Sequence, residues 1–239
     1  MDNDVLIARR RAILAAIDVL RDVCGDGCAL GLGTGSTIEL FIDTVKDRDE
    51  LSILRKSIVF PSSRSTASKL FALGIAPTMY DTYADVITID VYIDSADEVD
   101  HRCYMVKGGG GALLREKVLT MLARTTLFIV DFNKLSDLIG TKKPVPIEVV
   151  PSALPLVMKS LKDLRLEYRV RLSRTSYGVT YSDNGNALID IVTGPITDPE
   201  SLDSTLAKIP GVVATGIFSR KYVSKIFIGF SDHVKILTP

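Results

Sequence analysis

Residues 107–117 read KGGGGALLREK, and the four glycines are Gly108, Gly109, Gly110 and Gly111. Glycine loses the most backbone entropy on ordering, so a run of four is unfavourable inside a helix or a strand. The bare backbone can bring its N–H groups close to a ligand. Glu116 falls in the first turns of a helix expected over 112–124, where flanking cations and the helix N-terminus stabilise a carboxylate as an anion. The run therefore indicates a loop that binds a small ligand beside a base; the alternative is an ordinary charged helix surface.

The segment GLGTGST at 31–37 joins a short apolar strand expected over 28–33 to a helix expected over 36–45. Free backbone N–H groups and the positive end of the helix dipole make such a junction a place for an anion. The lysine of a P-loop is missing, and Ser36 stands where a dinucleotide fingerprint has its last glycine. Three hydroxyls suit a single phosphate monoester instead, although a tight turn capped by Ser36 or Thr37 explains the same residues. The candidate phosphate ligands are Thr34, Gly35, Ser36 and Thr37.

Charged side chains follow two further strands, expected over 86–94 and 126–130. DSADEVD at 94–100 ends the first strand, and DFNK, with Lys134, ends the second. Ligands of a parallel sheet bind outside the carboxyl ends of its strands, so these groups are expected at the same edge as the glycine loops. Four carboxylates in seven residues repel one another unless cations such as Lys107 compensate; the alternative is a solvated acidic turn. The four carboxylates are Asp94, Asp97, Glu98 and Asp100.

Strands alternate with helices as far as about residue 139, which predicts an α/β fold. The expected architecture is a Rossmann-like parallel sheet with helices on both faces. A helix over 5–21, a strand over 57–60 and a helix over 63–74 that ends at Gly74 complete this part.

The pattern changes near residue 140. TKKPVPIEVVP at 141–151 carries three prolines, which favour an extended connector over a regular element. Asn184-Gly185 between apolar runs predicts a hairpin turn, and Asp198 is the expected N-cap of a helix over 198–209. These signals predict a smaller α+β (ferredoxin-like) domain at 140–218, with the catalytic domain at 1–139 and 219–239, because the strand at 224–230 is expected to return to the first sheet. The other expected elements are a helix over 152–163 and strands over 166–173, 177–182, 187–192 and 212–218.

Composition excludes several classes of protein. The 239 residues carry 29 basic and 29 acidic side chains, so neither nucleic-acid nor membrane binding is indicated, and no apolar stretch is long enough to span a bilayer. Three cysteines, Cys24, Cys28 and Cys103, predict small buried thiols in a reducing cytoplasm rather than disulfides. The two histidines do not have metal-ligand spacing, so a zinc site is not expected.

Taken together, GLGTGST, DSADEVD, KGGGGALLREK and DFNK resemble the signatures of the type A ribose-5-phosphate isomerase family, in the same order and at similar intervals. PVPIEVVP, SDNGN and IPGVVATGIF also look like the family's, so the resemblance covers nearly the whole chain. It implies reversible conversion of ribose 5-phosphate to ribulose 5-phosphate through an enediolate, in the non-oxidative pentose phosphate pathway. It also implies a phosphosugar as the small-molecule partner, no metal, no organic cofactor, and a homodimer or homotetramer.

The same resemblance implies roles for individual residues. Glu116 corresponds to the base that moves a proton between C1 and C2. Asp94, Asp97 and Lys107 match the groups that open the furanose and hold its oxygens. Lys134 matches the lysine of the D-x-x-K motif, and the hydroxyl-rich loop at 34–37 matches the phosphate site. The backbone N–H groups of the glycine run, or Lys107, can stabilise the enediolate oxygen.

Two features depart from the family pattern. Ser95 stands where the family usually has glycine, and a positive φ there would strain a serine by about 1 kcal/mol or more. The first helix is longer than typical, so one arginine among Arg9, Arg10 and Arg11 is a candidate for the phosphate, the alternative for each being a solvated basic face.

Three other functions are alternatives to the isomerase. A non-catalytic sugar-phosphate sensor on the same fold would not need Glu116 and Lys107. An acyl-CoA transferase would need more chain than 239 residues supplies, and a nucleotide-dependent oxidoreductase lacks its fingerprint.

Overall fold

The computed structural model describes residues 3–48, 50–78, 88–173 and 178–239. The chain divides into two compact units. The first unit comprises Met1–Ser95, Val118–Leu135 and Lys221–Pro239, and the second unit comprises Ala96–Lys117 and Ser136–Arg220. The division expected at 140 and 218 lies close to two of these boundaries. It differs in the segment 96–117, which groups with the second unit and carries the glycine run.

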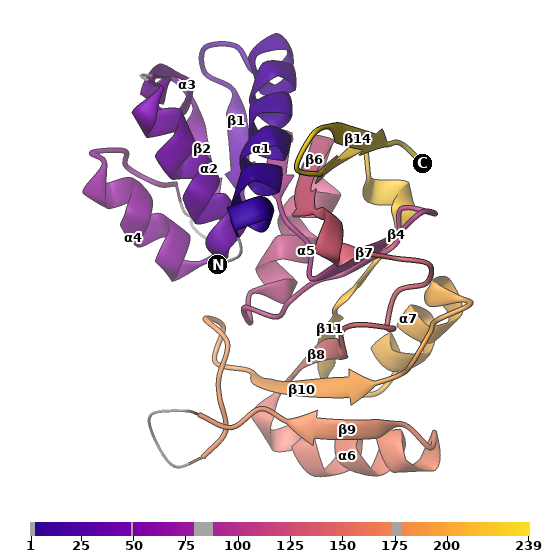
Figure 1. Cartoon of the computed structure of the whole chain (residues 1–239). Coiled ribbons are helices and arrows are strands. Elements are labelled where there is room, and N and C mark those ends of the chain that lie inside the picture. Colours follow the sequence, from indigo (N-terminus) through magenta and orange to yellow (C-terminus); the bar gives the residue numbers. More distant parts are fainter. Residues whose placement is uncertain (1–2, 49, 79–87, 174–177) are drawn as a thin grey trace. The chain divides into compact units, whose positions relative to one another are not determined.

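The first unit contains a six-stranded sheet in the order β14-β13-β6-β3-β1-β2. Five strands are mutually parallel, and β14 pairs with β13 in the antiparallel sense at one edge. The parallel α/β sheet predicted from the alternation of strands and helices is confirmed, and so is the return of the last strands to it (Figure 1). The strands are β1 (Ala29–Leu32), β2 (Ile58–Pro61), β3 (Ile89–Asp94), β6 (Ala123–Asp131), β13 (Lys225–Gly229) and β14 (Val234–Leu237). The helices are α1 (Asn3–Val23), α2 (Ser36–Asp47), α3 (Leu51–Arg55) and α4 (Arg64–Ala72).

The core of the first unit follows from the two periodicities in its sequence. Along each strand every second side chain faces α1 and α2, as Val91 and Ile93 of β3 do. Along α1, Ile13, Ile17 and Leu20 lie on one face and are fully or almost fully buried in the same cluster. This packing holds the carboxyl ends of β1, β3 and β6 at one sheet edge, where the charged motifs follow them.

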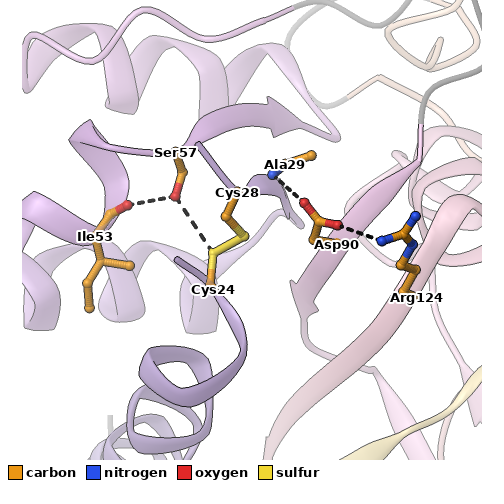
Figure 2. Close-up of a disulfide and its surroundings, with 7 residues drawn as sticks. All are labelled: Cys24, Cys28, Ala29, Ile53, Ser57, Asp90 and Arg124. Atoms are coloured by element: carbon orange, nitrogen blue, oxygen red, sulfur yellow. Dashed lines mark hydrogen bonds and ion pairs between the residues drawn. A yellow bond between two sulfur atoms is a disulfide. The ribbon is translucent and has the colours of Figure 1, made fainter. Parts of the chain in front are cut away.

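A disulfide bond joins Cys24, just after α1, to Cys28, just before β1, with a Cα–Cα distance of 5.4 Å (Figure 2). Near it, the Ser57 hydroxyl donates to the Ile53 carbonyl and lies 3.8 Å from the Cys24 sulfur. The prediction of free buried thiols is therefore wrong for this pair, because the turn brings the two Cβ atoms together. It is confirmed for Cys103, which is free and buried. The thiols accordingly give no argument for a reducing compartment.

The second unit contains an antiparallel sheet in the order β11-β8-β10-β9, with helices α6 and α7, and a smaller sheet in the order β12-β5-β4-β7. The prediction that 141–151 is only a connector is wrong: β8 is an interior strand of the larger sheet. Proline tolerates strand φ values, and the Pro146 carbonyl still accepts a hydrogen bond from the Gly216 N–H. The larger sheet and its helices are β8 (Val145–Val149), β9 (Glu167–Val170), β10 (Ala187–Val192), β11 (Val212–Thr215), α6 (Leu154–Asp163) and α7 (Pro199–Ala207). The remaining elements are β4 (Glu98–Asp100), β5 (Met105–Val106), β7 (Leu135–Ser136), β12 (Ile217–Phe218), α5 (Leu113–Leu122) and the 3-10 turns Phe132–Lys134, Pro151–Ala153 and Arg220–Tyr222.

Local signals in the second unit are mostly confirmed. Asp198 caps α7 by accepting a hydrogen bond from the Ser201 N–H at 3.1 Å, and Gly185 has φ 77° in the turn before β10. Of the strand expected over 177–182, residue 177 lies outside the described residues, and the rest form only isolated bridges. Residues 86–87 of another expected strand also lie outside them. No helix within the described ranges has the length and apolar content that a bilayer crossing requires.

Candidate active site

The GLGTGST segment forms the junction of β1 and α2 in the first unit. The N-cap of α2 is Gly35, with φ 96°, and not Ser36 or Thr37 as expected, because glycine reaches this backbone conformation without strain. The Thr34 hydroxyl lies 2.8 Å from the Ser63 hydroxyl, which in turn caps α4. Ser36 is exposed, whereas Thr37 is buried. The loop therefore presents helix N–H groups and one exposed hydroxyl, that of Ser36, which is an arrangement that can bind an anion.

One of the three neighbouring arginines reaches this loop. The Arg9 Nη1 donates to the Ser36 Oγ at 3.2 Å, and the Arg9 Nε donates to the Asp131 Oδ2 at 2.8 Å. Arg10 and Arg11 are exposed. Asp131 is almost fully buried, so its carboxylate fixes the guanidinium beside the loop. Sequence reasoning could not choose among the arginines, because the selecting partner lies 122 positions away.

Asp94, the last residue of β3, is fully buried in the first unit. Its carboxylate accepts hydrogen bonds from the Tyr92 hydroxyl and, at 2.7 Å, from the Ser95 N–H. An added Cβ on Gly33 would lie 1.8 Å from the Asp94 Oδ1, so only glycine leaves room for this carboxylate. Ser95 is not among the described non-glycine residues with positive φ, so the strain expected from its replacement of glycine is absent.

The acidic cluster separates into structural and candidate functional carboxylates. Glu98 is fully buried and accepts hydrogen bonds from the backbone N–H groups of residues 140, 142 and 143 at 3.0–3.1 Å. Asp100 is also buried, and it pairs with Arg102 at 2.8 Å. These two hold loops of the second unit together. Asp97 is only half-buried, and its Oδ2 accepts a hydrogen bond from the Gly109 N–H at 2.7 Å.

The glycine run places two ionisable residues together in the second unit. The Lys107 Nζ lies 3.3 Å from the Glu116 Oε2, and the exposed fractions of the two side chains are 3% and 4%. The same ammonium lies over the Phe218 ring, 5.4 Å from its centroid, which adds a cation–π contact. A buried ion pair is costly unless both charges are compensated, so it marks a place where charge is needed. Glu116 lies in the first turn of α5 as predicted, and its carboxylate is held beside a cation.

Lys134 closes the 3-10 turn after β6 and is half-buried. The Asp131 side chain caps this turn by accepting a hydrogen bond from the Asn133 N–H at 3.1 Å. Asp131 thus both orders the DFNK turn and holds Arg9. Its contact with Arg9 connects the DFNK turn to the GLGTGST loop, which are separate motifs in the sequence.

The predicted residues therefore form two groups, one in each unit. The first unit holds the residues of the loop at 34–37 with Arg9, Asp94 beside Gly33, and the turn with Lys134. The second unit holds Lys107 with Glu116, and Asp97 with the glycine run. Within the described ranges, no three histidine, cysteine, aspartate or glutamate side chains gather in a way that could hold a metal ion.

Known proteins are similar to this chain in sequence and in structure. The family model of ribose 5-phosphate isomerase A (phosphoriboisomerase A) matches residues 58–233. The chain belongs to the ribose 5-phosphate isomerase A family. Two proteins named ribose-5-phosphate isomerase A are each 38% identical to it: one from Aeropyrum pernix, covering 94% of this chain and 89% of that protein, and one from Blochmanniella floridana, covering 87% and 88%.

Solved structures of ribose 5-phosphate isomerases have the same fold as this family member. The enzyme from Methanocaldococcus jannaschii matches with a TM-score of 0.86 and 32% identity, over 97% of this chain and 98% of that one. A second D-ribose-5-phosphate isomerase, solved in complex with phospho-erythronic acid, also matches with a TM-score of 0.86, at 31% identity over 97% and 99% of the two chains. The α/β architecture predicted from the sequence is therefore confirmed at the level of the family.

Proposed function

We propose that this chain catalyses the reversible isomerisation of D-ribose 5-phosphate to D-ribulose 5-phosphate through an enediolate, as an enzyme of the non-oxidative pentose phosphate pathway. The observation that carries this function is the buried pair of Lys107 and Glu116, 3.3 Å apart at the end of the glycine run. A carboxylate kept next to an ammonium is available to accept a proton from carbon. The names of the relatives and the phospho-erythronic acid bound to one of them support a phosphorylated sugar as substrate.

Glu116 is the base in this proposal. Its carboxylate takes the proton from C2 of the open-chain aldose, and the electron pair moves into a C1–C2 double bond while the aldehyde oxygen takes up negative charge. Glu116 returns the proton to C1, and the proton of the C2 hydroxyl passes to the negatively charged oxygen on C1 as the ketone forms at C2. Lys107 and the N–H groups of the glycine run stabilise the enediolate oxygens, since charge develops there only during the reaction.

Asp94 and Asp97 act before this step, on the closed sugar. Opening a furanose needs a proton removed from the anomeric hydroxyl and a proton delivered to the ring oxygen, and carboxyl groups can do both. Asp97 is the more accessible of the two, and the Gly109 N–H holds it. Asp94 is fully buried and is held by Tyr92 and Ser95.

The phosphate is bound by the loop formed by Thr34, Gly35, Ser36 and Thr37. Arg9 adds a fixed cation to this loop, and Lys134 supplies a second cation for the substrate. Further parts of the proposal rest on the family alone: a cytoplasmic location and a homodimer or homotetramer. No metal takes part, because the lysines supply the positive charge that the carboxylates and the enediolate require.

The alternative is a non-catalytic sugar-phosphate sensor, which would keep the phosphate loop without needing a buried base. The test is conversion of ribose 5-phosphate to the ketose in the presence of EDTA, with unphosphorylated ribose as the control substrate. We expect turnover of the phosphate ester and very poor turnover of ribose. Binding of ribose 5-phosphate without turnover would favour the sensor. Equal rates on the two sugars would show that the loop does not bind the phosphate.

A further inference from the structure

Arg171, which follows β9 in the second unit, holds the glycine run from the side opposite to Asp97. Its Nη1 donates to the carbonyl oxygens of Gly108 at 3.0 Å and Gly109 at 3.1 Å. Its Nε and Nη2 donate to the two carboxylate oxygens of Asp190 in β10, at 2.7 and 2.6 Å. One planar guanidinium therefore fastens two consecutive peptide groups of the run to the sheet.

The positions of these carbonyls fix the directions of two N–H groups. In a trans peptide the C=O and the following N–H point in opposite directions, and no peptide bond among the described residues is cis. The carbonyls of Gly108 and Gly109 face Arg171, so the N–H groups of Gly109 and Gly110 face away from it. The first of these donates to the Asp97 Oδ2 at 2.7 Å. Gly109 and Gly110 are both exposed, so the second donor is accessible to a small ligand.

We propose that the ion pair of Arg171 and Asp190 is a positioning device for the isomerase reaction: it aims the Gly109 N–H at Asp97 and the Gly110 N–H at an oxygen of the sugar that gains negative charge. This inference rests on the proposed role of the glycine run. Consecutive backbone donors on one side of a chain form an anion-binding concavity, and their value depends on being oriented before the charge appears.

The need for such a device follows from the glycines themselves. The four glycines have no side-chain rotamers to hold their peptide planes, and two of them, Gly108 and Gly111, have positive φ. The Gly111 N–H donates to the Gly108 carbonyl at 3.0 Å, but this turn hydrogen bond involves neither the Gly109 carbonyl nor the Gly109 and Gly110 N–H groups. A Cβ at Gly109 would lie 2.7 Å from the Asp97 Oδ1, so a larger residue cannot rigidify the run. The run therefore depends on contacts from outside, and Arg171 supplies them. Lysine at this position cannot reproduce the contact, because a single ammonium cannot grip two carbonyls and both oxygens of a carboxylate.

The test compares Arg171→Met and Asp190→Asn with the control Arg169→Met, two residues earlier, where the exposed side chain lies 3.5 Å from Glu167. We expect Arg171→Met to lower kcat about 100-fold, the size of losing one oriented oxyanion donor, with KM for ribose 5-phosphate within about threefold. Asp190→Asn is expected to lower kcat about tenfold, because the guanidinium stays but loses its charged anchor. Arg169→Met should match the wild type. In ¹⁵N-glycine NMR spectra, the Gly109 and Gly110 amide signals should move in the first two variants only.

Several results would overturn the positioning role. One is a kcat within about threefold of wild type in folded Arg171→Met. Another is a loss that follows only the folded fraction measured by circular dichroism. Should Arg171→Met fail to fold, a wild-type kcat together with unmoved glycine signals in Asp190→Asn would also overturn the positioning role. Glu116→Gln, assayed in parallel, distinguishes failure of the proposed function from failure of the positioning role. If Glu116→Gln keeps near-normal turnover, the proposed function of the glycine run is wrong. If Glu116→Gln is inactive while Arg171→Met has normal turnover, only the positioning role is wrong.

Discussion

Two glycine-rich loops look alike in the sequence but use their glycines differently. In GLGTGST, Gly33 makes room for the Asp94 carboxylate, and Gly35, with φ 96°, is the N-cap of α2. The groups proposed to bind the phosphate are hydroxyls and Arg9, whose side chain is 13% exposed. In KGGGGALLREK, the proposed binding groups are the backbone N–H groups themselves. Arg171 donates to the carbonyls of Gly108 and Gly109, and the ionisable pair of Lys107 and Glu116 is almost fully buried.

This difference indicates a division of labour. A phosphate is already charged when it binds, so an open loop with helix N–H groups binds it in the ground state and in the transition state alike. An enediolate exists only during the reaction, so its binding groups are useful when they are buried and oriented in advance. Changes in the first loop should therefore act mainly on KM, and changes around the second should act mainly on kcat.

The largest effect is expected from Glu116→Gln. It removes the base while keeping the shape of the side chain, so kcat should fall by about three orders of magnitude or more, with phosphosugar binding within about tenfold. The matched control is Glu39→Gln, because Glu39 also lies in the first turn of the helix after a glycine loop but is exposed. Steady-state kinetics on both variants would settle the comparison. Near-normal turnover in Glu116→Gln removes it from this role.

The next largest effect is expected from Gly33, which leaves room for the Asp94 carboxylate. Gly33→Ala would push a methyl group into Asp94, so kcat/KM should fall about 100-fold or more, or the loop should move and lower the stability of the first unit by about 1–3 kcal/mol. Gly25→Ala is the control, since nothing lies within 4 Å of a Cβ there and its φ is not positive. Wild-type kinetics and thermal unfolding in Gly33→Ala would show that Asp94 does not need this space.

A smaller effect is expected at the open loop. Ser36→Ala removes a hydroxyl that contacts Arg9, so it should raise KM for ribose 5-phosphate about 5- to 100-fold, the value of one hydrogen bond to a charged group, with little change in kcat. Ser52→Ala, at an exposed position of α3, serves as the control. An unchanged KM together with a reduced kcat would contradict the division of labour.

The smallest effect on activity is expected from the cysteines. Cys24→Ala with Cys28→Ala should lower the free energy of unfolding by about 2 kcal/mol, because the disulfide closes only a short loop, and should leave kcat unchanged. Burial raises the pKa of the Cys103 thiol, and the nearby Asp100 carboxylate raises it further, so this thiol stays protonated and unreactive at neutral pH. Thiol titration should therefore detect none in the native protein, one after unfolding without reductant, and three after reduction. Three after unfolding alone would disprove the disulfide.

The sequence predicted what depends on local pattern. The alternation of strands and helices, the cap at Asp198 and the turn at Gly185 each depend on a few neighbouring residues, and all are confirmed. The positions of Glu116 on its helix and of the glycine run before it also follow from local chemistry. The roles of the predicted site residues remain predictions that the experiments above address.

What the sequence could not predict depends on contacts between distant residues. Arg9 donates a hydrogen bond to Asp131, which holds it beside the GLGTGST loop. The carbonyls of the glycine run accept hydrogen bonds from Arg171, 62 or 63 positions away. The strand β8 contains Pro146, which locally disfavours a strand, and its pairing with β10 and β11 depends on residues far away in the sequence. The disulfide needed the geometry of one turn, which counting cysteines does not reveal.

The most direct test of the central claim, that Glu116 carries a proton between C1 and C2, is the reaction in D₂O with EDTA. A proton on a carboxylate can exchange with solvent, whereas a hydride passed directly between carbons cannot. We predict full activity after chelation, and deuterium at C1 of the ribulose 5-phosphate, detected by NMR. In Glu116→Gln, both the activity and the incorporation of deuterium should be lost. Turnover without deuterium at C1 or C2, or activity restored only by an added metal ion, would contradict this mechanism.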